Sequence, residues 1–334
     1  MRKPAVAAFI IAAAAVAVTA CTAPEPAGAP ARRMSELPPP PAPADNPITA
    51  EKAALGKLLF HDKRLSGNGQ MACQSCHYHH LGWADATRFS AMHNGNLNTR
   101  HTPTIYNVAY QTSWYWDGRA ATLEANNLAA WRNQMGGDPA RVAASLNAIP
   151  AYREAFQKAF GAPASQDTIV KALATYFRTL NTGESAWDRH EMGRANAVSR
   201  DAREGFDLFA GKGRCIVCHT PPFYTNNEHY NIGLEAGKAK PDPGRFNVTR
   251  RVEDTGAFKT PTLRAVARSA PYFHDASAAT LEEAVRYMAG GGRADPHKTP
   301  LMIPTGLTDA EIRKIVAFLE ALTGNDTYEA PRLP

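Results

Sequence analysis

Apolar residues recur along much of this chain with the period of an α-helix. Capping boxes at residues 280–283 and 308–311 predict helices that reach Met288 and Leu322. No segment alternates convincingly enough to predict a strand, so the pattern predicts a mainly α protein. The clearest amphipathic stretch is residues 167–180, where apolar side chains stand three or four positions apart: Ile169, Val170, Leu173, Tyr176, Phe177 and Leu180.

The chain begins with a short apolar run. Arg2 and Lys3 precede residues 5–20, which are almost entirely apolar. A bilayer span needs about 20 such residues, so this run predicts a signal peptide over residues 1–20. The following Val18-Thr19-Ala20-Cys21 resembles a bacterial lipobox, in which Cys21 is lipidated and becomes the new N-terminus. Ordinary cleavage near Ala20, which leaves a free thiol, is the alternative.

Residues 21–47 are rich in proline and alanine, including Pro38 to Pro41. Proline fixes φ and removes a hydrogen-bond donor, so this segment predicts a semi-rigid extended tether and no core. A tether after a lipidated cysteine suits an enzyme that stands off a membrane. The folded part is expected to start near Ile48.

Composition narrows the class of protein. With 334 residues, of which 44% are hydrophobic and 20% are charged, the chain can form two domains and is not globally disordered. Lys and Arg total 37 against 31 Asp and Glu. This small excess is spread along the chain, so the sequence predicts no nucleic-acid partner.

Four of the five cysteines form two copies of the pattern C-x-x-C-H. We call residues 73–77 (Cys73, Cys76 and His77) the first haem motif, and residues 215–219 (Cys215, Cys218 and His219) the second haem motif. In this signature both thiols bond to the haem vinyl groups and the histidine ligates iron. A zinc site or a thioredoxin-like pair does not require a histidine after each second cysteine. The sequence therefore predicts two covalently bound haem c groups.

The stretches before the two motifs are also alike. Leu58-Leu59-Phe60 and a glycine-containing turn precede the first motif, and Phe206-Asp207-Leu208-Phe209 with a second such turn precedes the other. A helix, a turn and a haem motif, each found twice, predict two cytochrome c-like haem domains. We place them at residues 48–190 (the first haem domain) and 191–328 (the second), joined by a linker near residues 185–197.

Further motifs extend this likeness. Over residues 48–325 the chain resembles the bacterial di-haem cytochrome c peroxidase and MauG family. The matching stretches, in family order, are Leu58-Leu59-Phe60, Trp116-Asp117-Gly118-Arg119-Ala120, Thr260-Pro261-Thr262-Leu263-Arg264, Pro271-Tyr272-Phe273-His274-Asp275 and Leu281-Glu282-Glu283-Ala284-Val285. The resemblance implies that the first haem reacts with hydrogen peroxide and that the second receives electrons.

The resemblance also suggests axial ligands. Met288 matches the distal ligand of the second haem, opposite His219, and a thioether there favours reduced iron. MauG-like members have a tyrosine at that position. Here Tyr287 is adjacent, but one residue turns a side chain by about 100° around a helix, which favours the peroxidase over a MauG-like oxidase. His93 matches a histidine that can cap the peroxide-reactive haem at rest.

Three more positions follow from the resemblance. Trp116 matches a tryptophan between the haems that provides an electron route. The distal acid–base positions hold Asn126 and, after a gap of two residues, Gln134, where the family has Gln and Glu. Glutamine hydrogen-bonds but accepts no proton near neutral pH, so peroxide turnover is in doubt unless another acid, such as Glu124 or Asp138, takes part.

Other histidines carry weaker expectations. His101 stands where relatives often have an asparagine near a calcium ion, whose other ligands are carbonyls around Ser269 and Pro271. Calcium prefers oxygen ligands, so calcium is left open and is not expected. His79 and His80 are expected at the surface without a role.

The sequence thus predicts a periplasmic, lipid-anchored di-haem cytochrome c peroxidase. Its partners would be hydrogen peroxide and a small periplasmic cytochrome c or cupredoxin, and a homodimer is left open. Two alternatives remain: a MauG-like oxidase that modifies Trp or Tyr of a partner protein, and a non-catalytic electron carrier.

Overall fold

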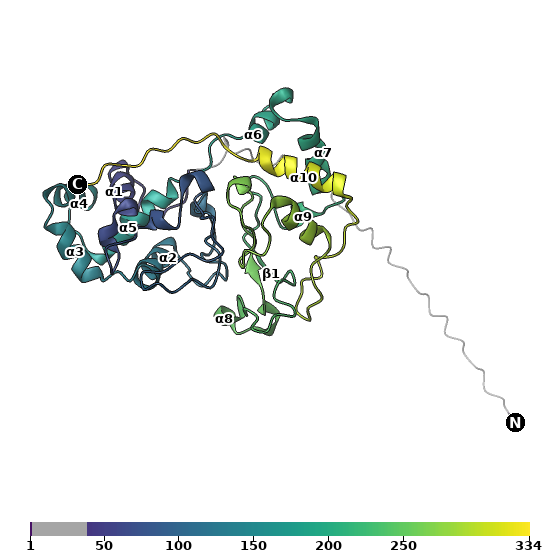
Figure 1. Cartoon of the computed structure of the whole chain (residues 1–334), viewed down its shortest axis with the longest axis horizontal. Helices are drawn as coiled ribbons and strands as arrows, with labels where there is room; N and C mark the ends of the chain where they lie inside the picture. The colour runs from purple at the N-terminus through teal and green to yellow at the C-terminus, as the bar shows by residue number, and fades with distance from the viewer. Residues whose placement is uncertain (2–38) are drawn as a thin grey trace. The chain divides into compact units, whose positions relative to one another are not determined.

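The computed structural model describes residue 1 and residues 39–334 of the chain (Figure 1). The predicted signal peptide, Cys21 and most of the predicted tether lie outside the described residues. The described residues 39–334 belong to one compact unit. In the part of the chain that is described, no helix has the length and apolar character needed to span a bilayer.

The described residues are mainly helical, as predicted. The helices of the first haem domain are α1 (Ala50–His61), α2 (Leu123–Ala129), the π-helical turn η6 (Ala130–Gln134), α3 (Pro139–Asn147), α4 (Pro150–Phe160) and α5 (Gln166–Arg178). Those of the second are α6 (Ala186–Glu191), α7 (Arg200–Ala210), α8 (Phe246–Thr249), α9 (Leu281–Ala289) and α10 (Asp309–Ala321). Two short strands, β1 (His229–Tyr230) and β2 (Phe258–Lys259), pair antiparallel.

Short 3₁₀ turns connect these helices. Those that matter for the site are η3 (Cys73–Ser75) and η8 (Cys215–Val217), one in each haem motif. The others are η2 (Lys63–Leu65), η4 (His79–Leu81), η5 (Val108–Tyr110), η7 (Ala195–Ala197), η9 (Val252–Asp254) and η10 (Val266–Arg268).

The helices predicted from the sequence are present, and the predicted N-cap residues begin α9 and α10. Ser165 caps α5, and its side chain accepts a hydrogen bond from the backbone N–H of Thr168. Thr280 and Thr308 cap α9 and α10 in the predicted capping boxes. The fold class predicted from the sequence is therefore confirmed.

Each haem domain has its own core, built on one pair of crossing helices. In the first, α1 packs on α5, and in the second α7 packs on α10. A glycine stands at each crossing. A Cβ atom on Gly56 would lie 2.1 Å from the Ala172 carbonyl oxygen, and one on Gly205 would lie 1.9 Å from that of Lys314. The close approach of both helix pairs thus requires a residue without a side chain.

Two segments have more structure than the sequence predicted: the linker between the domains and the residues after α10. Residues 185–197, predicted as a linker, contain α6, and Trp187 of this helix packs in the second core. After α10, residues 325–334 run back to the first haem domain, where Tyr328 packs against the first core (Figure 1, yellow). We call residues 325–334 the C-terminal strap.

The two domains repeat each other closely over one stretch. Tyr115 and Phe273 both have positive φ, at 65° and 71°, and a β-bridge closes the loop around each. Eight residues after each, α2 and α9 begin at Leu123 and Leu281. Each second member lies 158 residues after the first (115 and 273, 123 and 281), so residues of this stretch can be paired by number.

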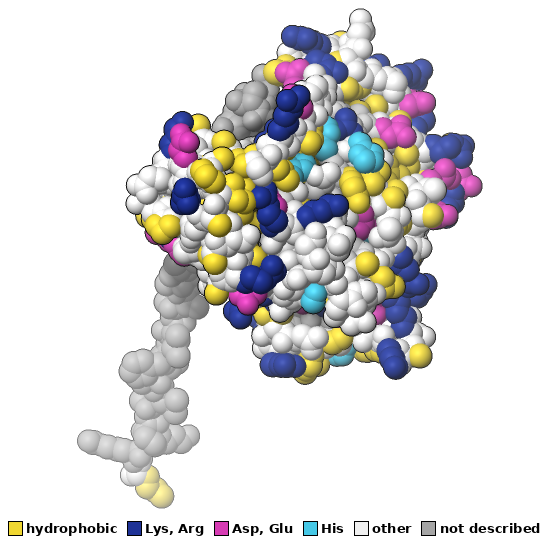
Figure 2. All heavy atoms as spheres, turned by 60° about the vertical axis from the view of Figure 1, so that its left-hand side comes forward, with side chains coloured by type: hydrophobic (Ala, Val, Ile, Leu, Met, Phe, Trp, Pro, Cys, Tyr) yellow, Lys and Arg dark blue, Asp and Glu magenta, His cyan; other side chains and the backbone are white. Residues whose placement is uncertain are grey.

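Charged side chains are dispersed over the surface. On the face shown in Figure 2, Lys and Arg lie in separate small groups, several of them beside Asp or Glu. This distribution agrees with the diffuse charge of the sequence.

Candidate functional site

Both haem motifs line one continuous cavity of about 690 Å³. Among the described residues the four cysteines of the motifs, Cys73, Cys76, Cys215 and Cys218, are free thiols. Burial raises the pKa of Cys73 and of Cys215 to about 12, so both remain neutral thiols at neutral pH. The site therefore offers two pairs of unpaired thiols, each followed by a histidine, around a single cavity.

In the first haem motif a main-chain carbonyl group orients the histidine ring. His77 Nδ1 donates a hydrogen bond to the Trp83 carbonyl oxygen at 2.7 Å. Burial lowers the pKa of His77, so the ring is neutral and Nε2 carries a lone pair. A metal-ligating histidine commonly has this arrangement, because the bond at one nitrogen fixes the tautomer at the other.

The second haem motif has the same arrangement. His219 Nδ1 donates to the Tyr224 carbonyl oxygen at 2.9 Å. Burial lowers the pKa of His219 to about 4. The donor sets of both motifs fit haem c: two neutral thiols for the thioether bonds and one neutral imidazole for the iron.

The predicted distal ligand of the second motif lies on α9. Met288 lines the cavity together with His219, whereas the adjacent Tyr287 does not. Instead the Tyr287 hydroxyl donates to the Ile232 carbonyl oxygen at 3.0 Å. The Met288 side chain thus reaches this part of the cavity, and the Tyr287 hydroxyl is bound to Ile232 instead.

The distal side of the first motif is formed by α2 and η6. Asn126 and Gln134 both line the cavity, as does Ala130. Ala130 begins the π-helical turn, which ends at Gln134, and such turns often mark functional sites. The Gln134 side-chain N–H donates to Asn98 Oδ1 at 3.4 Å. The two predicted distal residues, Asn126 and Gln134, thus line the same cavity.

The two carboxylates considered as substitutes are engaged elsewhere. Glu124 pairs with Arg178 at 2.7 Å and accepts a hydrogen bond from Asn46. Asp138 caps α3 and accepts from the backbone of Ala140. Neither lines the cavity, in which Asp117 is the one carboxylate among the described residues.

His93 lies apart from the cavity. Its backbone N–H donates to the Gln134 carbonyl oxygen at 2.9 Å, but its side chain is not among the cavity-lining residues. The ring lies against Gly136, where an added Cβ atom would be 2.4 Å from His93 Cε1. Ligation by His93 therefore stays a prediction and would require this ring to move.

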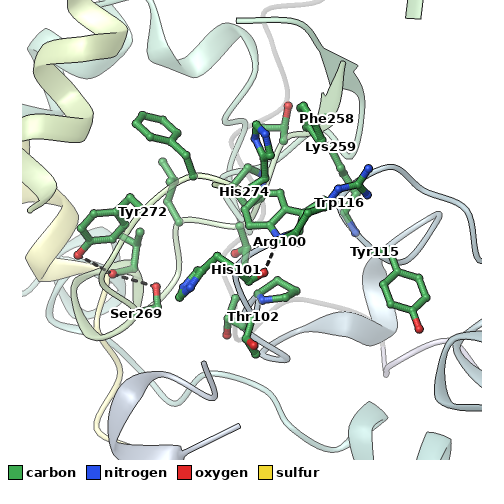
Figure 3. A pocket seen from close by; sticks show the side chains of 18 of the residues that line it. Arg100, His101, Thr102, Tyr115, Trp116, Phe258, Lys259, Ser269, Tyr272 and His274 are labelled. Carbon is green, nitrogen blue, oxygen red and sulfur yellow. Dashed lines mark hydrogen bonds between the residues drawn. The ribbon is translucent and has the colours of Figure 1, made fainter. Parts of the chain in front are cut away.

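Trp116 lies where the two domains meet. Its indole N–H donates to the His101 carbonyl oxygen at 2.8 Å, and its ring meets that of His274 edge to face at 6.4 Å (Figure 3). The His101 backbone N–H donates to the His274 carbonyl oxygen at 2.7 Å. These bonds fix the tryptophan on the cavity wall that both motifs share.

Charged groups surround Trp116. Arg100 binds Asp117 and Asp242, each at 2.7 Å, and so joins the two domains. Lys259 donates to Gln111 Oε1 and to a main-chain oxygen but has no carboxylate partner in contact. Burial lowers the pKa of Lys259 to about 7, which leaves an ammonium group near its titration point beside the cavity.

The position considered for calcium offers a nitrogen donor. His101 Nδ1 donates to the Thr87 carbonyl oxygen at 2.9 Å, and His101 Nε2 is buried without a hydrogen-bond partner. Calcium takes oxygen ligands, so this side chain does not fit it. Among the described residues no group of three or more His, Cys, Asp or Glu is arranged to hold a metal ion.

One prediction about surface histidines was wrong, and two residues of the site had no predicted role. His79, expected at the surface, is half-buried and pairs with Asp326 at 2.8 Å, whereas His80 is exposed. Ala130 had no predicted role, and His274 was matched only as part of the stretch at residues 271–275. The 158-residue repeat was the signal that could have found them, since it pairs Ala130 with Met288 and Trp116 with His274.

Comparisons with known proteins agree with a site built from two haem motifs. The family model described as di-haem cytochrome c peroxidase matches residues 50–196, and that of cytochrome c matches residues 202–323. Cytochrome-c peroxidase IdrP1 of Denitromonas iodatirespirans is 37% identical to this chain and covers 96% of this chain and 95% of its own. Methylamine utilization protein MauG of Methylorubrum extorquens is also 37% identical, over 88% of this chain and 84% of its own. The crystal structure of a MauG-like protein associated with microbial copper homeostasis superposes with a TM-score of 0.79 at 32% identity, covering 86% of this chain and 94% of that one.

Proposed function

Because the chain belongs to the di-haem cytochrome c peroxidase and MauG family, we propose that it reduces hydrogen peroxide to water with electrons from a small periplasmic redox protein. Family membership makes the chain an oxidoreductase that carries haem c. The assignment of peroxide to the first haem domain and of electron delivery to the second is part of the proposal.

The first haem motif holds the group at which peroxide reacts. Cys73 and Cys76 would form the thioether bonds, and His77 would offer Nε2 as a ligand while the Trp83 carbonyl oxygen holds its other nitrogen. Haem c bound there would supply the iron and the electrons for reduction of peroxide. Ala130, a small residue on the distal side, leaves room for peroxide.

The distal residues of the first domain can orient peroxide but cannot accept its proton. Gln134 and Asn126 present amide groups to the cavity. An amide donates and accepts hydrogen bonds without titrating near neutral pH. Since Glu124 and Asp138 are bound elsewhere, proton transfer between the two peroxide oxygens is expected to be slow.

The second haem motif is where electrons arrive. We propose that His219 and Met288 would both hold the second haem, which would leave no free position for peroxide. Val217, Leu301 and Ile303 line the same part of the cavity and are 39% to 43% exposed. Such an apolar rim suits a small redox protein that docks briefly. Trp116 lies between the motifs on the proposed electron route.

One observation supports the peroxidase over a MauG-like oxidase: Met288 lines the cavity and Tyr287 does not. The test is the oxidation of a reduced small cytochrome c by hydrogen peroxide, followed by absorbance. We expect two donor molecules to be oxidised for each peroxide consumed. Peroxide that disappears without oxidation of the donor would overturn the proposal.

A MauG-like oxidase is the second candidate, because MauG of Methylorubrum extorquens is as similar in sequence as the peroxidase IdrP1. It would modify Trp or Tyr of a partner protein. The two candidates separate in the same assay, since an oxidase of this type would consume peroxide and leave the small cytochrome reduced.

We also propose a periplasmic location with lipid attachment at Cys21. The support is the sequence of residues 1–47 and the extracytoplasmic attachment of haem c. Mass spectrometry of the mature N-terminus tests this: an acylated Cys21 is expected, and an unmodified N-terminus overturns the lipid anchor.

A further inference from the structure

The C-terminal strap places one tyrosine among aromatic side chains of the first haem domain. The Tyr328 ring lies 4.7 Å from that of Trp83, 5.1 Å from His79 and 5.8 Å from His61, measured between centroids. Trp83 is the residue whose carbonyl oxygen holds His77. The strap is fixed there by Asp326, which binds His79, and the Tyr328 ring is half-buried.

The hydroxyl of Tyr328 has a proton acceptor in contact. It is hydrogen-bonded to His61 Nε2, and His61 Nδ1 is hydrogen-bonded to Gln74 Oε1. An amide oxygen only accepts, so the proton of His61 stands on Nδ1. Nε2 therefore carries a lone pair that accepts the Tyr328 hydroxyl. Burial lowers the pKa of His61, which keeps its ring neutral at neutral pH.

Two contacts join this pair to the first haem motif. Gln74 is itself a residue of that motif, between Cys73 and Cys76. The Tyr176 hydroxyl donates to the Tyr328 oxygen at 3.3 Å, and Cys73 packs against the core cluster that contains Tyr176. Tyr176 thus contacts Tyr328 and belongs to the core on which the thioether position packs.

Lys57 determines which oxidised form of Tyr328 can exist. Its ammonium lies 4.9 Å from the centre of the Tyr328 ring. A positive charge over the ring opposes the removal of an electron alone, since that would leave a cation beside a cation. Removal of the electron together with the phenolic proton leaves a neutral ring. The presence of His61 as acceptor therefore decides whether Tyr328 is oxidised.

We propose that Tyr328 is a redox-active tyrosine that gives one electron to the first haem site and its phenolic proton to His61 Nε2. The oxidant is the oxidising equivalent that hydrogen peroxide leaves at that site, so the inference rests on the proposed function. The O–H bond of Tyr328 breaks and an N–H bond forms on His61. The products are a neutral tyrosyl radical and an imidazolium, and one returning electron with the same proton restores both residues.

This relay would act when donor electrons are lacking. Tyr328 is half-buried at the surface, so small one-electron reductants such as ascorbate can reach it. The strap would then carry oxidising equivalents out of the cavity and away from Met71 and Met135, which line it beside the first haem motif. Thioethers are readily oxidised to sulfoxides.

The test uses the holoprotein without an electron donor. It is mixed with hydrogen peroxide and a nitroso spin trap, frozen for electron paramagnetic resonance and digested for mass spectrometry. We expect a neutral tyrosyl signal and a trap adduct on the peptide that contains Tyr328. Tyr328→Phe should remove both, and His61→Gln should slow radical formation by about 10²-fold or more, the lower end of what a positioned proton acceptor contributes. The rate in wild type should also fall in D₂O.

The control is Tyr152→Phe. Tyr152 is a buried tyrosine of the same domain that donates to Asp62 at 2.6 Å and lies outside the strap. This variant should keep the signal and the adduct at Tyr328. An unchanged signal in Tyr328→Phe, or equal loss in Tyr152→Phe, overturns the inference.

A second oxidant separates this inference from the proposed function. Flash-quench oxidation with a ruthenium trisbipyridine complex needs no reaction with peroxide. If wild type forms the Tyr328 radical by this route but does not consume peroxide, the proposed function fails and the tyrosine–histidine pair is supported. If peroxide is consumed and neither route gives a radical at Tyr328, the pair is overturned and the proposed function stands.

Discussion

The two haem domains use the same frame to hold the cofactor and different residues to control access to it. In both, a glycine lets two helices cross closely, α1 with α5 and α7 with α10, and the motif histidine donates to a main-chain oxygen five or six residues later. On the distal side the repeat pairs Ala130 with Met288. Both line the cavity, but only one has a side chain long enough to reach a metal. In the proposed function, this one difference between equivalent positions distinguishes the peroxide site from the electron-transfer site.

The same pairing matches Trp116 with His274, and these two rings contact each other between the domains. Equivalent positions of the two halves therefore meet at their boundary. The half with the open distal side has the more readily oxidised ring, and the other half has an imidazole bonded to Glu235.

Ala130→Met should have the largest effect, because it gives the first domain the distal residue of the second. A thioether at this position would occupy the place of peroxide and lower the rate of the peroxide reaction by about 10³-fold, within the range that a blocked active site loses. Stopped-flow absorbance of the half-reduced protein measures this rate. The matched control is Ala125→Met, since Ala125 is exposed on α2, which leads directly into η6, and does not line the cavity. Equal rates for wild type and Ala130→Met would show that the repeat does not define the distal position.

Gln134→Glu should act in the opposite direction, by restoring a titrating group to the open site. Positioned acid–base groups contribute about 10²–10⁴-fold, and a Glu at this position should give about a 10²-fold gain in O–O cleavage. The carboxylate accepts a proton only when it is ionised, so the gain should be present above its pKa and be lost as the pH falls through it. Rates measured from about pH 3 to pH 6, on both sides of the ordinary Glu pKa of about 4.3, show this slope. Fast wild-type turnover that the variant does not exceed would instead indicate that another residue moves the proton.

Met288→Ala should make the second domain resemble the first. We expect loss of the weak near-infrared sulfur-to-iron band and a lower reduction potential of the second haem, because a thioether favours reduced iron. Near-infrared absorbance and potentiometric titration measure both. Met302→Ala is the control, since Met302 also lines this cavity but lies outside α9. A band that persists in Met288→Ala would limit Met288 to a packing role.

Lys259→Met should have the smallest effect, a change in how the free energy of unfolding depends on pH. The folded-state pKa of Lys259 is lowered to about 7 by burial, against about 10.4 in the unfolded chain. Between these values the unfolded state binds more protons, so the free energy of unfolding of wild type rises with pH from about 7 to 10. Lys259→Met should flatten that rise, as measured by denaturant unfolding at several pH values. Identical slopes in the two proteins would show that Lys259 keeps its ordinary pKa.

The parts of this structure that local sequence determines were predictable. The haem motifs, the caps at Thr280 and Thr308 and the amphipathic face of α5 each depend on a few neighbouring residues, and the helices form within about two residues of the expected bounds. The distal placement of Asn126 and Gln134 was inferred from a family resemblance with a gap. The π-helical turn η6, in which Gln134 stands, changes the helical register beside this gap.

Other features depend on contacts between distant segments and left no local signal. Glu124 looked available from its place in the sequence, but Arg178 and Asn46, far along the chain, bind it. His79 lies in a polar-looking turn, and its partner Asp326 is 247 residues away. Tyr328 stands alone in a short polar segment without periodicity, so no pattern could indicate that it packs beside the first haem motif.

The return of the C-terminal strap adds a segment distant in sequence to the first core. Asn46, just before α1, bonds through its side chain to Glu124 and Lys171, and Tyr328, beyond α10, packs against the same core. The strap follows both haem motifs in the sequence, so it is synthesised after them. The contact between His61 and Tyr328 therefore forms only after the other residues of the first core have been made.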